Sequence, residues 1–292
     1  MTHANFSIRP MSRIEFDLAL DWAAAEGWNP GLMDAEPFFS VDPQGLLIGL
    51  LSSEPVAVIS AVRYDAAFGF LGFYIVHPSY RGNGYGWRIW QAAMAHLGTR
   101  NVGLDGVTAQ QDNYRRSGFQ LAHRNIRYQG VAAQVPQPAA LPGDTHIVPL
   151  STLPLDQLSA FDGDFFPAQR PDFLRRWISQ PQTVALGLVN KQGLQAYGVR
   201  RSCRTGYKIG PLFAKRPEQA AALLAALCTG LANDAPIFLD VPECNPAAVA
   251  LAEACGMHKV FETARMYTQA APDLALSGIY GITSFELGRA PV

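Results

Sequence analysis

A glycine-rich turn between an apolar strand and an apolar helix is the part of this sequence best suited to chemistry. Leu71–Val76 predicts the strand, Arg81–Gly86 forms the turn, and the helix that follows stops near Gly98. The first N–H groups of a helix lack intrahelical partners, and the helix dipole adds about half a positive charge there. Glycines allow a phosphate to approach the backbone closely. The stretch therefore predicts a site for a phosphorylated ligand.

Two common phosphate-binding motifs do not fit this turn. A dinucleotide-binding turn needs a third glycine, but Trp87 stands in that position. The acid nearest the expected distance is Asp105, which lies inside a predicted strand. A P-loop needs Lys followed by Ser or Thr, and neither follows Gly86. A dinucleotide-binding oxidoreductase therefore stays only as a weak alternative.

The turn instead resembles that of the GNAT superfamily of N-acetyltransferases. Arg81–Gly86 matches the family pattern R/Q-x-x-G-x-G/A, and Asn113–Phe119 looks like the family's tyrosine-bearing helix closed by Gly-Phe. The resemblance covers Ile8–Gly130 well and implies acetyl-CoA as the acyl donor, with no metal. The cofactor-binding residues that it implies are Tyr74, Ile75, Val76, Arg81, Gly82, Asn83, Gly84, Tyr85, Gly86, Asn113 and Tyr114.

The resemblance also implies catalytic roles. Tyr114 lies five residues before Phe119, where the family places a tyrosine whose hydroxyl protonates the departing CoA thiolate. Because an ordinary thiol has a pKa of about 8.5, loss of this acid should slow the reaction rather than abolish it. A backbone N–H near Ile75 or Val76 would stabilise the oxyanion formed during attack.

The residues do not settle which group acts as the base. An alkylammonium acceptor must lose a proton before it attacks, since its pKa is about 10.4. Glu36 and Asp105 are the predicted catalytic carboxylates, and Asp34 and His77 stay open as alternatives. The irregular loop Gly27–Gly45 is either a packed surface loop or a wall of the acceptor site. In the second case the substrate-binding residues are Trp28, Asn29, Asp34, Glu36 and Phe38, which weakly favour a cationic or amphipathic acceptor.

The elements around this turn form an order that occurs twice. Short helices closed by glycine, at Arg115–Phe119 and Glu253–Met257, are the clearest landmarks. We predict a mixed α/β fold with two GNAT-like modules, each a central mixed, largely antiparallel sheet flanked by helices. The predicted division is residues 1–133, an Ala/Pro-rich linker at 134–145, and residues 146–292, with a last strand at Thr283–Leu287.

The second copy lacks the features that carry the resemblance. Ile209–Pro217 holds no glycine pattern, and its two prolines remove N–H donors. Ala252 stands five residues before Met257, where a tyrosine would be expected. We therefore expect one cofactor site per chain, with the second module closing the substrate pocket or acting as scaffold.

Composition excludes several classes of protein. The chain has 292 residues, 49% hydrophobic and 16% charged, with a net charge of −1, so a packed core is expected and a nucleic-acid partner is not. No apolar helix reaches the roughly 20 residues that a membrane span needs. The four cysteines show no zinc spacing, and the N-terminus shows no signal-peptide pattern. These features predict a cytoplasmic monomer or homodimer.

Together these observations predict an acetyl-CoA-dependent N-acetyltransferase. The acceptor would be a primary amine of a small molecule or peptide, which attacks the thioester directly. The alternative is a non-catalytic acyl-CoA-binding sensor or interaction module.

Overall fold

The structure is a computed structural model that describes residues 5–138, 140–141 and 144–284. Within these residues, the elements of the first half are β1 (Phe6–Pro10), α1 (Arg13–Ala25), α2 (Ala35–Val41), β2 (Leu46–Leu51), β3 (Glu54–Arg63), β4 (Phe68–Val76), α3 (Tyr85–Leu97), β5 (Asn101–Val107), α4 (Gln111–Arg116) and β6 (Gln120–Val131). Those of the second half are β7 (His146–Pro149), α5 (Leu155–Asp162), α6 (Pro171–Ile178), β8 (Thr183–Asn190), β9 (Gly193–Ser202), β10 (Tyr207–Ala214), α7 (Pro217–Cys228), β11 (Pro236–Pro242), α8 (Pro246–Ala254), β12 (His258–Tyr267) and β13 (Ile279–Gly281). The order of elements is the same in both halves up to β13, which has no counterpart.

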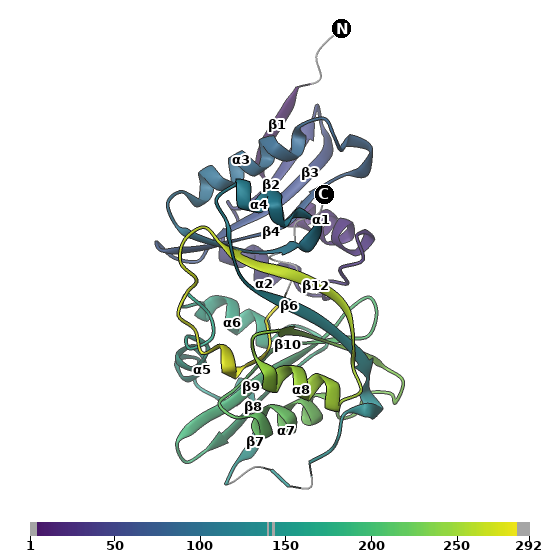
Figure 1. Ribbon diagram of the computed structural model, residues 1–292, viewed down its shortest axis with the longest axis vertical. Helices are drawn as coiled ribbons and strands as arrows, with labels where there is room; N and C mark the ends of the chain where they lie inside the picture. The colour runs from purple at the N-terminus through teal and green to yellow at the C-terminus, as the bar shows by residue number, and fades with distance from the viewer. Residues whose placement is uncertain (1–4, 139, 142–143, 285–292) are drawn as a thin grey trace.

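The strands form one mixed sheet whose middle is made by an exchange between the halves. The order is β1-β2-β3-β4-β5-β12-β6-β11-β10-β9-β8-β7, with β13 on β10. The sixth strand of each half thus pairs with the fifth strand of the other, β12 with β5 and β6 with β11. The two exchanged strands run antiparallel beside each other across the middle of the molecule (Figure 1). The mixed α/β fold is confirmed. The predicted division at residues 133 and 146 separates the two halves along the chain, but the sheet is continuous across it because β6 and β12 each pair with the other half.

The exchange is nearly two-fold symmetric. Asn125 on β6 lies opposite Thr263 on β12, and this pair marks the centre. At equal distance on either side, Arg265 lies opposite Asp105, and Arg127 lies opposite Asp240. The register therefore relates residues of β5 and β6 to counterparts in β11 and β12.

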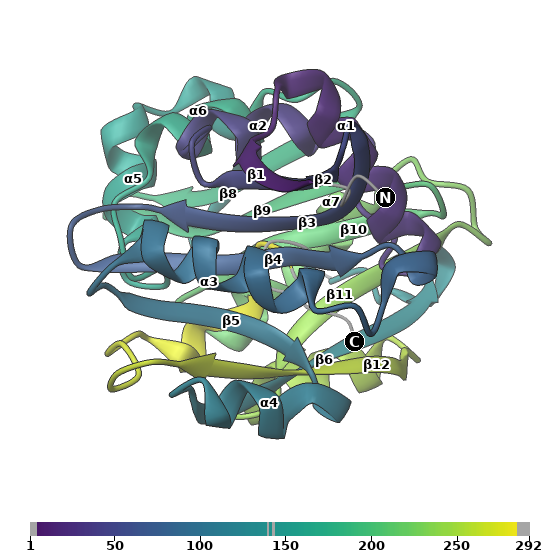
Figure 2. The ribbon, with the colours of Figure 1, turned by 90° about the horizontal axis from the view of Figure 1, so that it is seen from above.

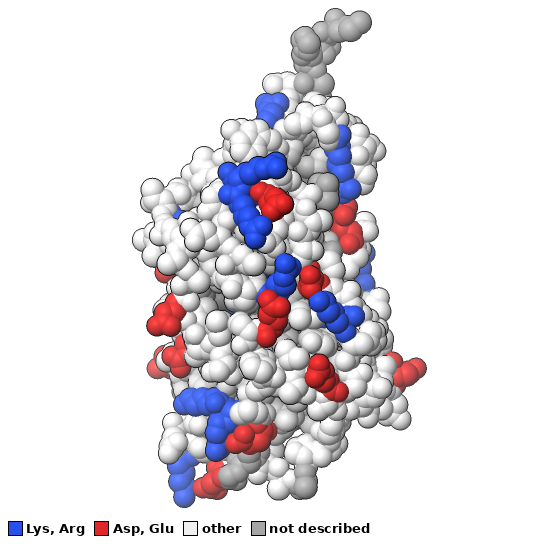
Figure 3. Space-filling view, viewed as in Figure 1, with Lys and Arg blue, Asp and Glu red and all other residues white. Residues whose placement is uncertain are grey.

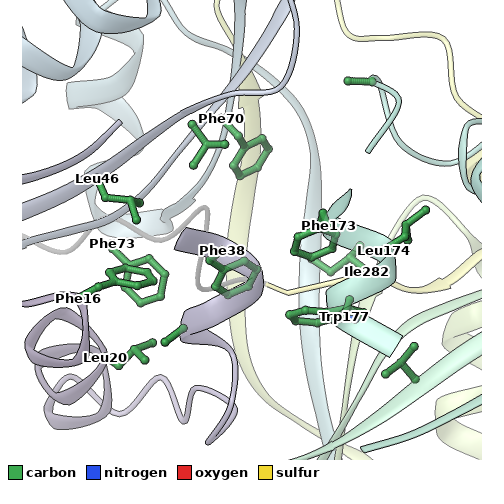
Figure 4. Packing of buried hydrophobic residues seen from close by; sticks show 14 of the residues in the cluster. Phe16, Leu20, Phe38, Leu46, Phe70, Phe73, Phe173, Leu174, Trp177 and Ile282 are labelled. Carbon is green, nitrogen blue, oxygen red and sulfur yellow. The ribbon is translucent and has the colours of Figure 1, made fainter. Parts of the chain in front are cut away.

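The helices divide the apolar core into three parts. α3 and α4 cover one face of the first half's sheet, and α7 and α8 cover the corresponding face of the second half. α1, α2, α5 and α6 lie between the two halves on the other face (Figure 2). In that shared core Phe38 of α2 lies between Phe73 on one side and Phe173 and Trp177 on the other (Figure 4). Because one core holds both halves, neither half is independently packed.

Local signals account for several helix ends. Ser12 and Glu15 form a reciprocal capping box at α1, which satisfies two backbone N–H groups. Asn245 caps α8 by accepting hydrogen bonds from the backbone N–H groups of Ala247 and Ala248. Gly118, with φ of 91°, follows α4 in the left-handed conformation that favours glycine.

Two predictions of secondary structure were wrong. The loop Gly27–Gly45 contains helix α2, which has only seven residues and is stabilised by burial of Phe38 rather than by a periodic apolar face. The last strand is Ile279–Gly281 and not Thr283–Leu287, because β10 offers its free edge there; Thr283 and Ser284 are not strand. Residues 285–287 of that prediction, and residues 139, 142 and 143 of the predicted linker, lie outside the described residues.

Candidate active site

A slot opens between β4 and β5 where the two parallel strands separate. They pair from Phe68 to Leu71 and from Asn101 to Leu104, and the described pairing ends there. β4 turns aside because it carries a bulge: its register to β3 shifts between Val58 and Ser60, where Phe73 takes a φ of +44°. A non-glycine residue in this region is strained by about 1–3 kcal/mol. The bulge lies directly after Leu71, the last residue of β4 that pairs with β5, so it coincides with the point where the strands separate.

The glycine turn lies at the outer end of this slot. Gly82 and Gly84 have φ of 79° and 81°, and a Cβ on either would meet nothing within 4 Å. Gly84 is the N-cap of α3 and supplies no side-chain cap, so the first turn of the helix presents its N–H groups outward. Gly86 is needed for packing, since a Cβ there would lie 2.6 Å from the hydroxyl of Tyr74. The turn has the geometry of an anion site.

The side chains of the turn are engaged within it. Arg81 donates from Nε to the carbonyl oxygen of Val76 at 3.0 Å and forms an ion pair with Glu26 at 2.5 Å. Asn83 donates to the carbonyl oxygens of Tyr80 and Arg81 at 3.1 and 3.2 Å. Both side chains therefore shape the loop, and the backbone is what faces a ligand.

A groove runs from the turn to the slot, between α3 and α4. Its inner part, of about 390 Å³, is lined by Tyr74, Trp87, Trp90, Gln110, Asn113, Tyr114, Arg116 and Ser117. Its outer part, about 180 Å³, is lined by Tyr74, Val76, Tyr80, Arg81, Gly82, Gly84, Tyr85, Gly86 and Trp87. The two parts share Tyr74 and Trp87. Most of the cofactor-binding residues predicted from the sequence thus lie in one groove.

Tyr114 lies at the inner end of the groove. Its ring stacks on Trp90, with 5.9 Å between centroids and 25° between planes. It also packs on Gly106 of β5, where a Cβ would come within 2.2 Å of the ring. Gly106 is the second residue of β5 beyond its last pair with β4. The phenol is therefore held beside the slot.

Tyr74 and two tryptophans complete the walls. Burial raises the pKa of Tyr74 to about 12, so its hydroxyl stays protonated. Trp87 is 57% exposed, although it follows the glycine turn directly. The sequence analysis missed Trp87 and Trp90 as site residues, because their helical spacing indicates a core face equally well. Gln110, Arg116 and Ser117 had no sequence signal.

The second half builds the same slot and then fills it. β10 and β11 pair from Tyr207 to Ile209 and from Ile237 to Leu239, and β10 shifts register at Gly210-Pro211. β13 then enters the gap: Gly281 pairs with Leu212, and the N–H of Ile282 donates to the carbonyl oxygen of Asp240 at 2.8 Å. The side chain of Asn245 holds the incoming segment by donating to the carbonyl oxygens of Ser277 and Ile279.

Asp105 lies next to the first slot, but in a bidentate ion pair. Its carboxylate accepts hydrogen bonds from Nε and Nη2 of Arg265 at 2.8 and 2.6 Å and from Asn125 at 2.7 Å. Burial lowers the pKa of Arg265, but the charge and hydrogen bonds of Asp105, together with the effect of Tyr267, outweigh burial and raise this pKa above its ordinary value. Asp240 and Arg127 form the counterpart pair at 2.6 and 2.7 Å. No sequence pattern joins partners so far apart along the chain.

The predicted substrate loop contacts the second half rather than the groove. Asn29 exchanges hydrogen bonds with the backbone of Thr205, and the carbonyl oxygen of Trp28 accepts from Arg127 and Lys208. Asp34 is buried in an ion pair with Arg201.

The other candidates on or near this loop are also engaged elsewhere. Glu36 is exposed and pairs with Arg13 and Arg176. Phe38 is core, and the ring of His77 packs near Trp22 and Tyr80. The structure therefore brings Tyr114 and Asp105 to the slot and does not bring Glu36 there.

Three further observations concern surface charge, possible metal ligands and helix length. Acidic and basic side chains are interspersed on the face shown in Figure 3, without a broad patch of one sign. In residues 5–138, 140–141 and 144–284, no group of three or more His, Cys, Asp and Glu side chains is placed to hold a metal ion. Within the same ranges, no helix has the length and apolarity to cross a bilayer.

Comparison with known proteins finds two related domains in the chain. Residues 13–119 match the model of the acetyltransferase (GNAT) family, and residues 158–281 match a model described as an acetyltransferase (GNAT) domain. Holothin acyltransferase from Pseudoalteromonas sp. (strain SANK 73390) is 31% identical over 287 residues, which cover 98% of this chain and 96% of that protein.

Solved structures show the same fold. A putative acetyltransferase from Pyrococcus horikoshii superposes with a TM-score of 0.78 at 19% identity, covering 98% of this chain and 96% of that one. A tandem GNAT protein from the clavulanic acid biosynthesis pathway gives a TM-score of 0.64 at 13% identity, covering 92% of this chain and all of that one. The fold, and not the substrate, is what these two likenesses show.

Proposed function

Because the chain belongs to the GNAT family of acyltransferases and carries two GNAT domains in tandem, we propose that its first half transfers an acetyl group from acetyl-CoA to a primary amine of a small molecule or peptide. The observation that carries the proposal is the open slot between β4 and β5, with the glycine turn at one end and Tyr114 at the other. Acetyl-CoA supplies the acyl group as an activated thioester.

The groove fits such a donor along its length. N–H groups from Arg81 to Gly86, together with the dipole of α3, would hold the pyrophosphate. The free edge of β4 at Tyr74, Ile75 and Val76 would pair with the amides of the pantetheine arm, as an added strand does. Asn113 lines the inner groove, where it would contact that arm.

The reaction uses few groups of this chain. The amine nitrogen attacks the thioester carbonyl carbon, the C–N bond forms, and a backbone N–H near Ile75 or Val76 stabilises the oxyanion. The C–S bond then breaks, and Tyr114 donates its proton to the thiolate and regains one from solvent. The proton lost by the amine nitrogen balances the proton gained by the thiol.

Of the two carboxylates predicted to be catalytic, Asp105 is the better placed to act as the base. It precedes Gly106, on which Tyr114 packs, whereas Glu36 is an exposed residue paired with two arginines. Since Asp105 already accepts three hydrogen bonds, it would act only if Arg265 released one of its oxygens. The four cysteines, all within the described residues, form no disulfide, which supports a reducing cytoplasmic location.

A panel of acceptors tests the proposal. Acetyl-CoA is mixed with primary amines, holothin among them because a relative is named for it, and free thiol is followed with time. Thiol release that depends on an amine supports acetyl transfer. CoA binding by calorimetry without transfer to any amine would instead support the acyl-CoA sensor. A donor series from acetyl to longer acyl groups shows which acyl group is preferred.

A further inference from the structure

A small cavity lies on the other face of the sheet from the groove. Alternation along β5 places Gly106 toward Tyr114 and Asp105 on the opposite face. There Arg265 covers Asp105, and the cavity, of about 50 Å³, begins at this arginine. It lies where an acceptor would approach the slot from the side away from Tyr114.

Both halves contribute walls, and six of the lining side chains are phenylalanine or tyrosine rings. The rings that line the cavity are Tyr64, Phe70, Phe165, Phe166, Phe213 and Tyr267. Phe70 comes from β4 of the first half, whereas Ile282, another lining residue, follows β13 of the second (Figure 4). Such a set of rings favours a flat apolar ligand or a cation above a ring face.

The cations for these rings are already supplied by the protein. The guanidinium of Arg170 lies 3.8 Å from the centroid of Phe166, and that of Arg265 lies 5.1 Å from the centroid of Phe70. Besides the phenols of Tyr64 and Tyr267, the charged or titratable residues lining the cavity among the described residues are His123, Arg170 and Arg265, with no Asp or Glu. The nearby carboxylates of Asp105 and Asp162 are bound bidentately to these same arginines. A cationic ligand would therefore meet positive charge and find no carboxylate.

His123 adds no charge at neutral pH. Burial, followed by the positive charge of Arg265, lowers its pKa to about 4, against smaller opposing effects of Asp105 and Asn125. The imidazole is thus a neutral, flat wall of the cavity.

The counterpart cavity, which contains Arg127 and is also lined by both halves, has a different lining. It is bounded by Ala24, Gly27, Asn29, Arg127, Gln129, Arg204, Thr205, Phe238, Val260 and Phe261. Its arginine, Arg127, corresponds to Arg265 by the symmetry of the exchanged strands, but its other walls are mostly polar or small. The counterpart cavity thus has two phenylalanine rings, Phe238 and Phe261, where the cavity beside the open slot has six Phe and Tyr rings, and this difference favours a planar ligand beside the open slot.

We propose that this cavity receives the acceptor, and that the acceptor is a small planar aromatic amine that is neutral at neutral pH. The inference rests on the proposed function. An arylamine is uncharged because its lone pair is delocalised into the ring, so it needs no base before it attacks. Its nitrogen forms the C–N bond, the C–S bond breaks, and the nitrogen's proton passes to water. This chemistry agrees with an Asp105 that is bound to Arg265.

The cavity must widen for a ring to enter. A closed cavity that holds benzene measures about 150 Å³, three times the volume found here. Phe165, Phe166 and Pro167 lie between α5 and α6 and form the second half's side of the cavity. We place the opening at this segment, which makes Phe166 the residue to change.

The test compares acceptors and variants with acetyl-CoA as donor. Aniline and an aminopyridine are compared with spermidine and lysine. We expect kcat/KM for the aromatic amines to be at least about 10-fold higher. Phe166→Ala should lower kcat/KM for the aromatic amines by about 10-fold through a higher KM, while CoA affinity by calorimetry stays unchanged. Phe166→Tyr keeps a ring at this position and should retain most of the wild-type kcat/KM. Phe238→Ala, in the counterpart cavity, is the matched control and should change neither value.

Each other outcome overturns the inference in a distinguishable way. Preference for spermidine or lysine, with no effect of Phe166→Ala, places the acceptor elsewhere and leaves acetyl transfer intact. A variant that changes acyl-length preference but not acceptor KM shows that the cavity holds the acyl group. If CoA binds and no amine is acetylated, the proposed function fails together with the inference. Phe166→Leu, which keeps an apolar side chain, separates loss of the ring from loss of folding.

Discussion

The two halves of the molecule each contain a slot between two parallel strands, but one slot is open and the other is occupied by β13. In each half, two parallel strands pair briefly and then separate because the first carries an irregularity, at Phe73 in β4 and at Gly210-Pro211 in β10. The first slot adjoins a glycine turn and a groove, whereas β13 fills the second. The strand geometry thus creates a gap in both halves. The sequence that follows the first strand differs between the halves: a glycine turn adjoins the open slot, and no glycine turn is present beside the slot that β13 fills.

The largest expected effect is at the glycine turn. Gly84→Glu adds a side chain at φ of +81° and a negative charge where the pyrophosphate would bind. We expect CoA affinity by calorimetry to fall about 1,000-fold, or about 4 kcal/mol. Gly230→Glu is the matched control, since Gly230 has φ of 78° and equally open surroundings but follows α7. Equal loss in both variants would show that strain, and not the site, is responsible.

The paired carboxylates give the next largest effect. If both ion pairs serve the strand exchange, Asp105→Asn and Asp240→Asn should each lower the free energy of unfolding by about 3 kcal/mol in urea. Arg127 and Arg265 would be left buried without full compensation. If Asp105→Asn and Asp240→Asn lose the same stability and neither carboxylate is the base, the two variants should also lose the same fraction of kcat. A much greater loss of kcat in Asp105→Asn would assign the base to Asp105.

A substitution at Gly210 should destabilise the segment that fills the second slot, which is β13 with the residues Ile282 and Thr283 that follow it. A Cβ there would lie 2.6 Å from the carbonyl oxygens of both Ile282 and Thr283, which are backbone atoms and must move. Gly210→Ala should therefore cost about 2 kcal/mol of unfolding free energy. CoA should still bind once per chain, because the second half has no glycine turn. If calorimetry gave two CoA molecules bound per chain, the second slot would also be a cofactor site and the proposed difference between the two slots would be wrong.

A smaller change is expected at the general acid. Tyr114→Phe keeps the ring that packs on Trp90 and Gly106 and removes only the hydroxyl. We expect kcat to fall about 20-fold, with unchanged CoA affinity, because a thiolate needs little help to leave. Tyr128→Phe on β6 serves as control and should keep full activity. A Tyr114→Phe enzyme with wild-type kcat would remove the tyrosine from the mechanism.

The smallest effect concerns acid stability. His123 has a folded pKa of about 4, below its unfolded value of about 6.5, so the unfolded chain binds its proton more readily. The free energy of unfolding should therefore decrease by about 1 kcal/mol as the pH falls from 6.5 to 5.5. His123→Phe introduces the residue found at the counterpart position, Phe261, and should remove that part of the slope. Urea melts at several pH values measure it.

Local features of the site could be predicted from the sequence. The glycine turn lies in one short stretch of sequence, and Tyr114 with the helix-ending Gly118-Phe119 lies in another. Each can therefore be recognised from neighbouring residues alone. Asn245 was predictable as a cap for the same reason. The absence of a glycine turn before α7 likewise predicted that the second half would differ.

Features that join distant residues could not be predicted. Asp105 was a candidate base because a carboxylate in a strand needs a partner, but that partner, Arg265, comes from the other half. Helix α2 forms because Phe38 is buried against Phe173 and Trp177. β13 becomes a strand because β10 has an open edge for it. In each case a contact made by the whole fold outweighs the local pattern.

The exchange of β6 and β12 makes this chain the single-polypeptide form of a swapped dimer. In a dimer of separate subunits, such an exchange would depend on protein concentration and would be lost on dilution. Here the covalent connection through residues 132–145 keeps both partners at a high effective concentration. Assembly is therefore unimolecular. Either half produced alone would leave an unpaired edge at β5 or β11, where a second copy could pair.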